Sequence, residues 1–229
     1  VRLLCIPFRM KKEHKIPSRR RFISLIGMGI ASIPFMGMLY GMFKGKYDFR
    51  VIKYTLFFDN LPEIFDGYRI IHISDIHSGS FDNPEKVQYG IDMINAQEGD
   101  AIFFTGDLVN NKATEMDEWI NHFKQLKAKD GIYSVLGNHD YGDYVQWNTP
   151  EEKEKNLEDL KKIHHNIGFY LLNNESVYIS RNGYRLAVIG VENWGRDFIK
   201  RGDLDEAIKG VPENDFKILL SHDPTYFEY

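Results

Sequence analysis

The run of 22 residues Phe22–Phe43 contains no charged side chain, and this limits what the chain can fold into more than any other feature. At about 1.5 Å per residue, a helix of this length is about as long as the hydrocarbon core of a bilayer is thick. Glycine and proline, here including Pro34, are more frequent in membrane helices than in soluble ones. The run therefore predicts a transmembrane helix over residues 22–43, with a buried core helix as the alternative.

The charge around this span predicts how the chain crosses the membrane. Residues 1–21 hold eight basic residues and one acidic residue, so the total charge of −4 leaves −11 for residues 22–229. By the positive-inside rule, residues 1–21 should form a basic cytoplasmic segment, and the chain after Lys44 should lie on the non-cytoplasmic side of the cell membrane. The stretch SRRRFIS (18–24) resembles a twin-arginine export signal, but no cleavage site precedes Tyr47, which favours an uncleaved anchor.

The composition of the remaining chain excludes several classes of protein. With 43% hydrophobic residues among 229, the chain is long enough to bury one globular core. The acidic body lacks the basic surface that electrostatic binding to nucleic acid requires, so we expect no nucleic-acid partner. The single cysteine, Cys5, excludes an intrachain disulfide and a cysteine-rich zinc site, so a metal would be held by His, Asp, Glu or Asn.

Short apolar runs and helical patterns alternate after the span, which predicts an α/β fold. The Asn182–Gly183 pair separates two alternating runs and predicts a hairpin with a type I′ turn. The aromatic stretch 47–59 is expected to form an N-terminal strand on the sheet, with a lipid-binding surface as the alternative. The predicted strands are 68–74, 101–105, 132–136, 176–180, 184–191 and 216–220, and the predicted helices are 84–97, 115–128, 151–167 and 204–209.

Side chains of metal-ligand type follow four of these strands, in the blocks DIH at 75–77, GD at 106–107, GNHD at 137–140 and SHD at 221–223. In open α/β sheets ligands bind at the carboxyl ends of the strands, so these blocks predict a site at that edge. Oxygen ligands combined with imidazole nitrogens suit Mn, Fe or Zn, and a carboxylate such as Asp107 can bridge two ions. The glycines before Asp107 and Asn138 would let the backbone approach a ligand closely.

In this order the blocks resemble those of the calcineurin-like metallophosphoesterase superfamily, from about Tyr68 to the end of the chain. Within it, the chain looks most similar to the membrane-attached bacterial branch, which includes exported phosphoesterases and lipid-linked UDP-sugar pyrophosphohydrolases. The resemblance implies an α/β layered β-sandwich flanked by helices, here preceded by the transmembrane helix. We therefore expect a basic segment at 1–21, the span at 22–43, a linker and first strand at 44–67, and the metallophosphoesterase domain at 68–229.

The resemblance also implies a set of metal ligands. Asp75 and His77 match the ligands of a first ion, and Asn138 and His222 match ligands of a second. Asp107 matches the carboxylate that bridges the two. The implied cofactor is a pair of divalent ions, Mn, Fe or Zn, and the implied nucleophile is a metal-bound hydroxide.

Two further residues of the GNHD block are implied to be catalytic. His139 matches a histidine that faces the substrate, where it would stabilise phosphoryl oxygens or protonate the leaving group. Asp140 is expected to orient the His139 imidazole through its other ring nitrogen.

The chain departs from the family pattern at its C-terminal end. The family continues with a Gly-His-x-His block that supplies each ion with another histidine, and the sequence stops at Tyr229 without it. Because the chain also begins with Val1 rather than Met, we interpret it as a C-terminally incomplete fragment of an active enzyme.

Several other polar residues have structural interpretations. His72 is expected to be a packed or hydrogen-bonded strand residue, and His164 and His165 are expected at the surface near a helix end. A further group follows the ligand-bearing strands and either shapes a substrate pocket or packs loops. This group is Asn110, Asn111, Tyr141, Asp143, Trp147 and residues 192–194.

Two classes of function remain. The first is a membrane-anchored, metal-dependent phosphoester or pyrophosphate hydrolase. Its expected substrate is a lipid-linked phosphate, as for a UDP-sugar lipid pyrophosphohydrolase, or a nucleotide. The second is a non-catalytic metal-binding scaffold that retains the fold. His139 beside Asn138 favours the first, because a scaffold has no need of a substrate-facing histidine.

Overall fold

A computed structural model describes residues 18–43, 45–195 and 199–228, and the chain divides into two compact units, Val1–Ile52 and Lys53–Tyr229. The first unit contains helix α1 (Arg19–Phe43), followed by a 3-10 turn at Gly45–Tyr47. By length and composition α1 is apolar enough to cross a membrane, and none of its apolar window is buried in the protein. Residues 1–17, most of the predicted basic segment, lie outside the described residues.

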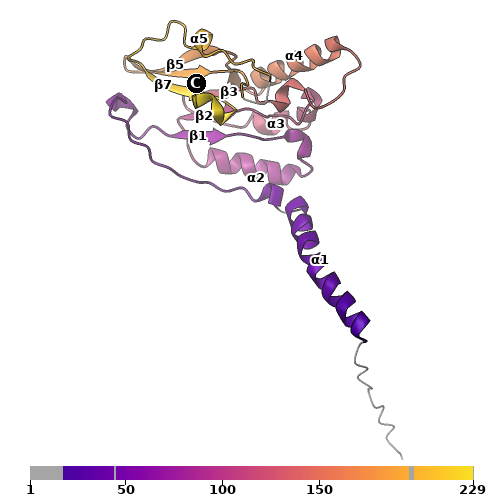
Figure 1. Cartoon of the computed structure of the whole chain (residues 1–229). Helices are drawn as coiled ribbons and strands as arrows, with labels where there is room; N and C mark the ends of the chain where they lie inside the picture. The colour runs from indigo at the N-terminus through magenta and orange to yellow at the C-terminus, as the bar shows by residue number, and fades with distance from the viewer. Residues whose placement is uncertain (1–17, 44, 196–198, 229) are drawn as a thin grey trace, which may run out of the picture. The chain divides into compact units, whose positions relative to one another are not determined.

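The second unit is built on two β-sheets (Figure 1). The first sheet is parallel, in the order β1 (Ile70–Ile73), β2 (Ala101–Thr105), β3 (Ile132–Val135) and β4 (Phe169–Leu171). In the second sheet, β6 (Tyr184–Gly190) lies between an antiparallel β5 (Glu175–Arg181) and a parallel β7 (Phe216–Leu220).

The core lies between the two sheets. Alternate residues of β2, Ala101 and Phe103, point into the same buried cluster as Val135 of β3 and as Leu186 and Val188 of β6. Burying a large apolar side chain stabilises the fold by roughly 1.5–3 kcal/mol, so this interface holds the sheets face to face. The predicted layered β-sandwich is confirmed.

Helices cover the outer faces of the sandwich. Helices α2 (Pro84–Asn95) and α4 (Pro150–Asn166) begin at side-chain caps, Asn83 and Thr149, each followed by proline at the first helical position. Figure 1 shows α2 along β1 and β2, on the side away from β7. The Phe104 ring, on the outer face of β2, packs 6.0 Å from the ring of His164 in α4. The short helices are α3 (Ile120–Phe123) and α5 (Leu204–Ala207).

The predicted hairpin is also confirmed. Strands β5 and β6 pair up to Arg181 opposite Tyr184, which leaves two residues in the turn. Both have positive φ, 48° at Asn182 and 83° at Gly183, as a type I′ turn requires.

Two predicted elements differ from the structure, and one strand was not predicted. Residues 48–62 form neither helix nor strand, because no described strand pairs with their backbone, and side chains such as Tyr54 and Phe57 are exposed. The helix predicted over 115–128 is a 3-10 turn at Ala113–Met116 followed by α3. There the Glu115 carboxylate accepts the N–H groups of residues 110–112 and holds the chain in a turn. Strand β4 was not predicted, because three residues are too few to show the alternation of apolar and polar side chains that identifies a strand.

The expectation that His164 lies at the surface is wrong. It is fully buried in the last turn of α4, between Phe104 and Phe169, with Nδ1 at 3.0 Å from Ser134 Oγ. Burial lowers the pKa of His164 to about 3, so the buried ring is neutral. His72 is the hydrogen-bonded strand residue expected, with Nε2 2.8 Å from Thr105 Oγ1.

His164 should make the fold sensitive to acid. Its pKa is lower in the folded chain than the ordinary 6.5, so between about pH 3 and 6.5 the unfolded chain binds a proton that the folded chain does not. This stability is present above pH 6.5 and is lost as the pH falls. We expect His164→Gln to flatten the dependence of unfolding free energy on pH from 6.5 to 4 by about 1.4 kcal/mol per pH unit. Denaturant titrations should show no such flattening for the exposed neighbour variant His165→Gln.

Candidate metal centre

Four strand ends meet at one edge of the sandwich. Strands β1, β2 and β3 are parallel neighbours, so the segments that follow them lie side by side. His222, after β7 of the other sheet, joins them with Nδ1 2.7 Å from the carbonyl oxygen of Thr105 at the end of β2. The residues that contacts bring together here are Asp75, His77, Asp107, Asn138, His139, Asp140 and His222.

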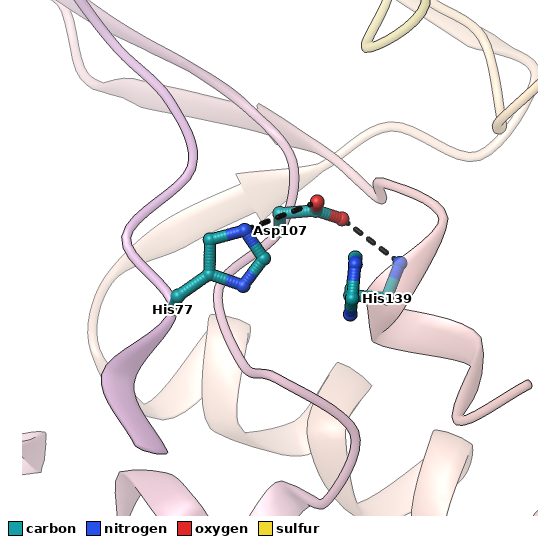
Figure 2. Close-up of side chains that lie close together, drawn as sticks. All are labelled: His77, Asp107 and His139. Carbon is teal, nitrogen blue, oxygen red and sulfur yellow. Dashed lines mark hydrogen bonds and ion pairs between the residues drawn. The ribbon is translucent and has the colours of Figure 1, made fainter. Parts of the chain in front are cut away.

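Asp107 lies at the centre of this cluster, with only 2% of its surface exposed. One carboxylate oxygen, Oδ1, accepts the backbone N–H of His139 at 2.9 Å. The other, Oδ2, lies 3.5 Å from His77 Nε2 and 3.4 Å from His222 Nε2. Figure 2 shows the His77 and His139 rings beside each other next to the Asp107 carboxylate, and their centroids are 4.8 Å apart.

The proton positions around His222 leave a set of lone pairs facing one another. A carbonyl oxygen only accepts, so Nδ1 of His222 must donate to Thr105, and Nε2 of the neutral ring carries a lone pair. That lone pair faces Asn138 Oδ1 at 3.0 Å and Asp107 Oδ2 at 3.4 Å. In this neutral tautomer the three acceptor atoms face one another, and a cation between them would stabilise the arrangement, so these residues fit a metal ion.

Two groups of ligand atoms satisfy metal-site geometry among the described residues. One is His77, Asp107 and His139, and the other is Asp75, Asp107 and His222, with the atoms of each group within 4.8 Å of one another. Asp107 belongs to both groups. Carboxylate and imidazole ligands together suit Mn, Fe or Zn.

Three of these residues have a backbone conformation that L-residues rarely adopt. Asp75, His77 and Asp107 have φ of 53°, 47° and 61°. The first two are held there by backbone hydrogen bonds of 3.0 Å to the carbonyl oxygens of Gly106 and Asp107. Such left-handed residues cost on the order of 1 kcal/mol or more each and concentrate at functional sites.

The glycines of the GD and GNHD blocks allow the loops to approach closely, as predicted. Gly106 has φ of 94°, and a Cβ there would clash with the backbone of Gly137. A Cβ on Gly137 would clash in turn with the Asp107 carboxylate. Side chains at either position would therefore displace Asp107.

Asp140 does not orient the His139 imidazole, and that prediction is wrong. His139 Nδ1 lies 2.7 Å from the carbonyl oxygen of Asn110 instead. Asp140 is fully buried and accepts four backbone N–H groups at 2.8–3.2 Å, from residues 107–109 and Gly137. Burial raises the pKa of Asp140 to about 7, while the amide donors favour the ionised form. Asp140 thus joins the loops that carry Asp107 and Asn138.

Sequence reasoning missed three groups that position the site. Two are the carbonyl oxygens of Thr105 and Asn110, which fix the tautomers of His222 and His139 and carry no side-chain signal. The third is Tyr144, whose hydroxyl accepts Asn138 Nδ2–H at 2.7 Å. In the sequence, the only sign of this contact is that Tyr144 lies six residues after Asn138.

Three of the residues suggested to line a substrate pocket make hydrogen bonds within or between loops. Trp147 Nε1 donates to the carbonyl oxygen of Gly142 at 2.8 Å. The Tyr141 hydroxyl donates to Glu192 at 3.0 Å, and burial raises the pKa of Tyr141. These contacts favour the loop-packing alternative for these three residues.

Comparison with known proteins agrees with this geometry. Residues 68–229, which hold all the strand-end residues above, match the family model of the calcineurin-like phosphoesterases. The chain belongs to this family. Residues 1–46 match a second model, described as a probable calcineurin-like phosphoesterase transmembrane domain, which agrees with the apolar helix α1.

Several curated relatives are bacterial metallophosphoesterases. The uncharacterized metallophosphoesterase YkoQ of Bacillus subtilis is 26% identical over 86% of this chain and 68% of its own length. A metallophosphoesterase of Aquifex aeolicus is 30% identical over 83% of this chain and 69% of its own. The UDP-2,3-diacylglucosamine pyrophosphatase LpxG of Chlamydia muridarum is 26% identical over 79% of this chain and 65% of its own. The chain spans about half the length of some other relatives, 42% and 54% in two cases.

Replacing Asp140 should separate the two loops. In Asp140→Asn the side-chain amide group replaces one carboxylate oxygen, and each of these oxygens accepts two backbone N–H groups. Buried unsatisfied donors cost about 1–3 kcal/mol each. We expect the free energy of unfolding to fall by about 3 kcal/mol or more in chemical denaturation. Asp92→Asn, on the exposed face of α2, is the matched control and should change it by less than about 0.5 kcal/mol.

Proposed function

We propose that this chain is part of a membrane-anchored, metal-dependent phosphoester hydrolase with a dinuclear metal site. The observation that carries the proposal is the position of Asp107 Oδ2, at 3.4–3.5 Å from the Nε2 atoms of two histidines, with Asp107 shared by both ligand groups. A single carboxylate between two sets of ligands is the arrangement that bridges two ions.

The residues that would hold the ions are those at the strand ends. Asp75 and His77, with Oδ1 and Nε2 3.9 Å apart, are the proposed ligands of one ion, and Asn138 and His222 of the other. Asp107 is the proposed ligand of both and belongs to both geometric groups, which themselves pair His77 with His139 and Asp75 with His222. When bound, divalent ions would act as Lewis acids, lower the pKa of bound water towards 7 and neutralise charge on a phosphoryl group. Mn, Fe and Zn are the candidates that these ligand types favour.

His139 is the proposed catalytic residue of the chain. Its Nδ1 donates to the carbonyl oxygen of Asn110, which leaves Nε2 to contact a phosphoryl oxygen or to deliver a proton to the leaving group. The backbone N–H of His139 is bonded to Asp107 Oδ1, so the ring is anchored to the same carboxylate that would bridge the ions.

The apolar helix and one of the relatives support a proposal for the substrate class. LpxG acts, by its name, on a diacylated UDP-sugar, and the residues before the domain match a transmembrane domain model. A lipid-linked phosphoester or pyrophosphate at the non-cytoplasmic surface of the cell membrane is therefore the proposed substrate. The net charge of −11 after residue 21 disfavours nucleic acid.

The roles of Asp107 and His139 can be separated by measuring metal and activity together. We expect Asp107→Ala to lose most bound metal, because both ions lose a ligand, and to lose hydrolysis with it. His139→Ala should keep its metal content while kcat falls roughly 10²–10⁴-fold. The measurements are elemental analysis of the purified chain and hydrolysis of an aryl phosphodiester with added Mn.

Two results would change the assignment. If Asp107→Ala retains both ions and the wild-type rate, the dinuclear proposal fails. If His139→Ala also loses metal, His139 is a ligand, as its group with His77 and Asp107 allows. Metal binding in the wild type with no hydrolysis of any phosphoester would favour the scaffold function.

The proposed orientation has its own test. An alkaline phosphatase reporter needs disulfides and is active only outside the cytoplasm. Fused after Lys53 in a bacterial host, it should be active, because the basic excess precedes the span. A reporter that is active only in the cytoplasm, fused at the same position, should be inactive. Activity of the cytoplasmic reporter alone would reverse the orientation.

A further inference from the structure

Tyr144 contacts two site residues at once. Its hydroxyl is 2.7 Å from Asn138 Nδ2, and its ring lies 4.5 Å from the His139 ring at an interplanar angle of 31°. The side chain is 52% exposed, so it lies at the open side of the cluster rather than in the core.

The hydroxyl contact holds the Asn138 carboxamide at the end opposite His222. For Oδ1 to lie 3.0 Å from His222 Nε2, the Nδ2–H group must point the opposite way. Nδ2 only donates, and the Tyr144 oxygen is the acceptor at that end. With this partner, the metal-ligating oxygen of Asn138 is held towards Asp107 and His222.

The ring contact restricts His139. The His139 ring makes an edge contact with His77 at 4.8 Å and 87°, and it is tilted by 31° against the Tyr144 ring. The hydrogen bond from Nδ1 to Asn110 fixes the rotation of the ring. Aromatic contacts of this kind contribute about 0.5–1.5 kcal/mol, enough to favour one ring position several-fold.

We propose that Tyr144 is a positioning residue that orients the Asn138 ligand through its hydroxyl and the His139 ring through its own ring. The inference rests on the proposed metal-dependent function, since it concerns how that site is built. The two contacts use different atoms of Tyr144, so they can be removed one at a time.

The test compares Tyr144→Phe with Tyr144→Ala in the full chain. Replacing residues that orient metal ligands typically weakens metal binding 10–100-fold, so we expect Tyr144→Phe to raise the Kd for Mn²⁺ about tenfold by calorimetry. Tyr144→Ala should raise Kd to a similar extent and, at saturating Mn²⁺, lower kcat about tenfold relative to Tyr144→Phe. Tyr184→Phe, 58% exposed at the hairpin, is the control and should bind Mn²⁺ like the wild type.

A double-mutant cycle distinguishes orientation of the ligand from a general loss of structure. If the hydroxyl acts through Asn138, Tyr144→Phe should not weaken Mn²⁺ binding further in an Asn138→Ala background. A further loss there, together with a lower melting temperature of Tyr144→Phe, would overturn the proposal in favour of a structural role.

The remaining outcomes separate this inference from the proposed function. Equal Kd values for wild type and Tyr144→Phe, with Mn²⁺ bound in both, would overturn the role of Tyr144 alone. A wild-type chain that binds no Mn²⁺ would overturn the proposed function and this inference together.

Discussion

The site depends above all on the buried carboxylate of Asp140. Its two oxygens accept four backbone N–H groups, three from the loop after β2 and one from the loop after β3. Since Oδ2 is shared by the amides of Asp107 and Gly137, this one group fixes the spacing of the two loops. A carboxylate is suited to this place because it offers only acceptors, and each amide left unpaired in the interior would cost about 1–3 kcal/mol.

The arrangement of Asp107 follows from that spacing. With the loops held together, Asp107 Oδ1 reaches the backbone N–H of His139, and Oδ2 is turned towards His77 and His222. The left-handed backbone of Asp75, His77 and Asp107 is retained because hydrogen bonds between the loops oppose its cost. The backbone strain lowers the stability of the fold, and it brings together acceptor atoms in an arrangement that fits a cation.

Burial and hydrogen-bond partners give the histidines of this protein different roles. His164 is enclosed by aromatic rings, remains neutral and supports the outer face of β2. His139 and His222 each donate Nδ1–H to a backbone carbonyl, which directs Nε2 into the cluster. The same side chain therefore serves as core packing in one layer and, in the proposed function, as a directed ligand or acid at the sheet edge.

The sequence alone determined the alternating α/β elements, the hairpin and the candidate ligands, because these depend on local patterns, and the family resemblance implied the sandwich. Parallel strands end at one edge, so a ligand-type residue after each of several apolar runs predicts that Asp107, Asn138 and His222 meet. The Asn182–Gly183 pair specifies its turn because both residue types readily adopt the positive φ that the turn requires. The tertiary structure decided what these patterns do not encode: that Asp140 binds backbone amides of residues 107–109 rather than its neighbour His139, that Tyr144 holds Asn138, and that His164 is buried. Those outcomes depend on main-chain groups and on segments about thirty residues apart, such as Asp140 and Asp107, which come together only when the loops pack.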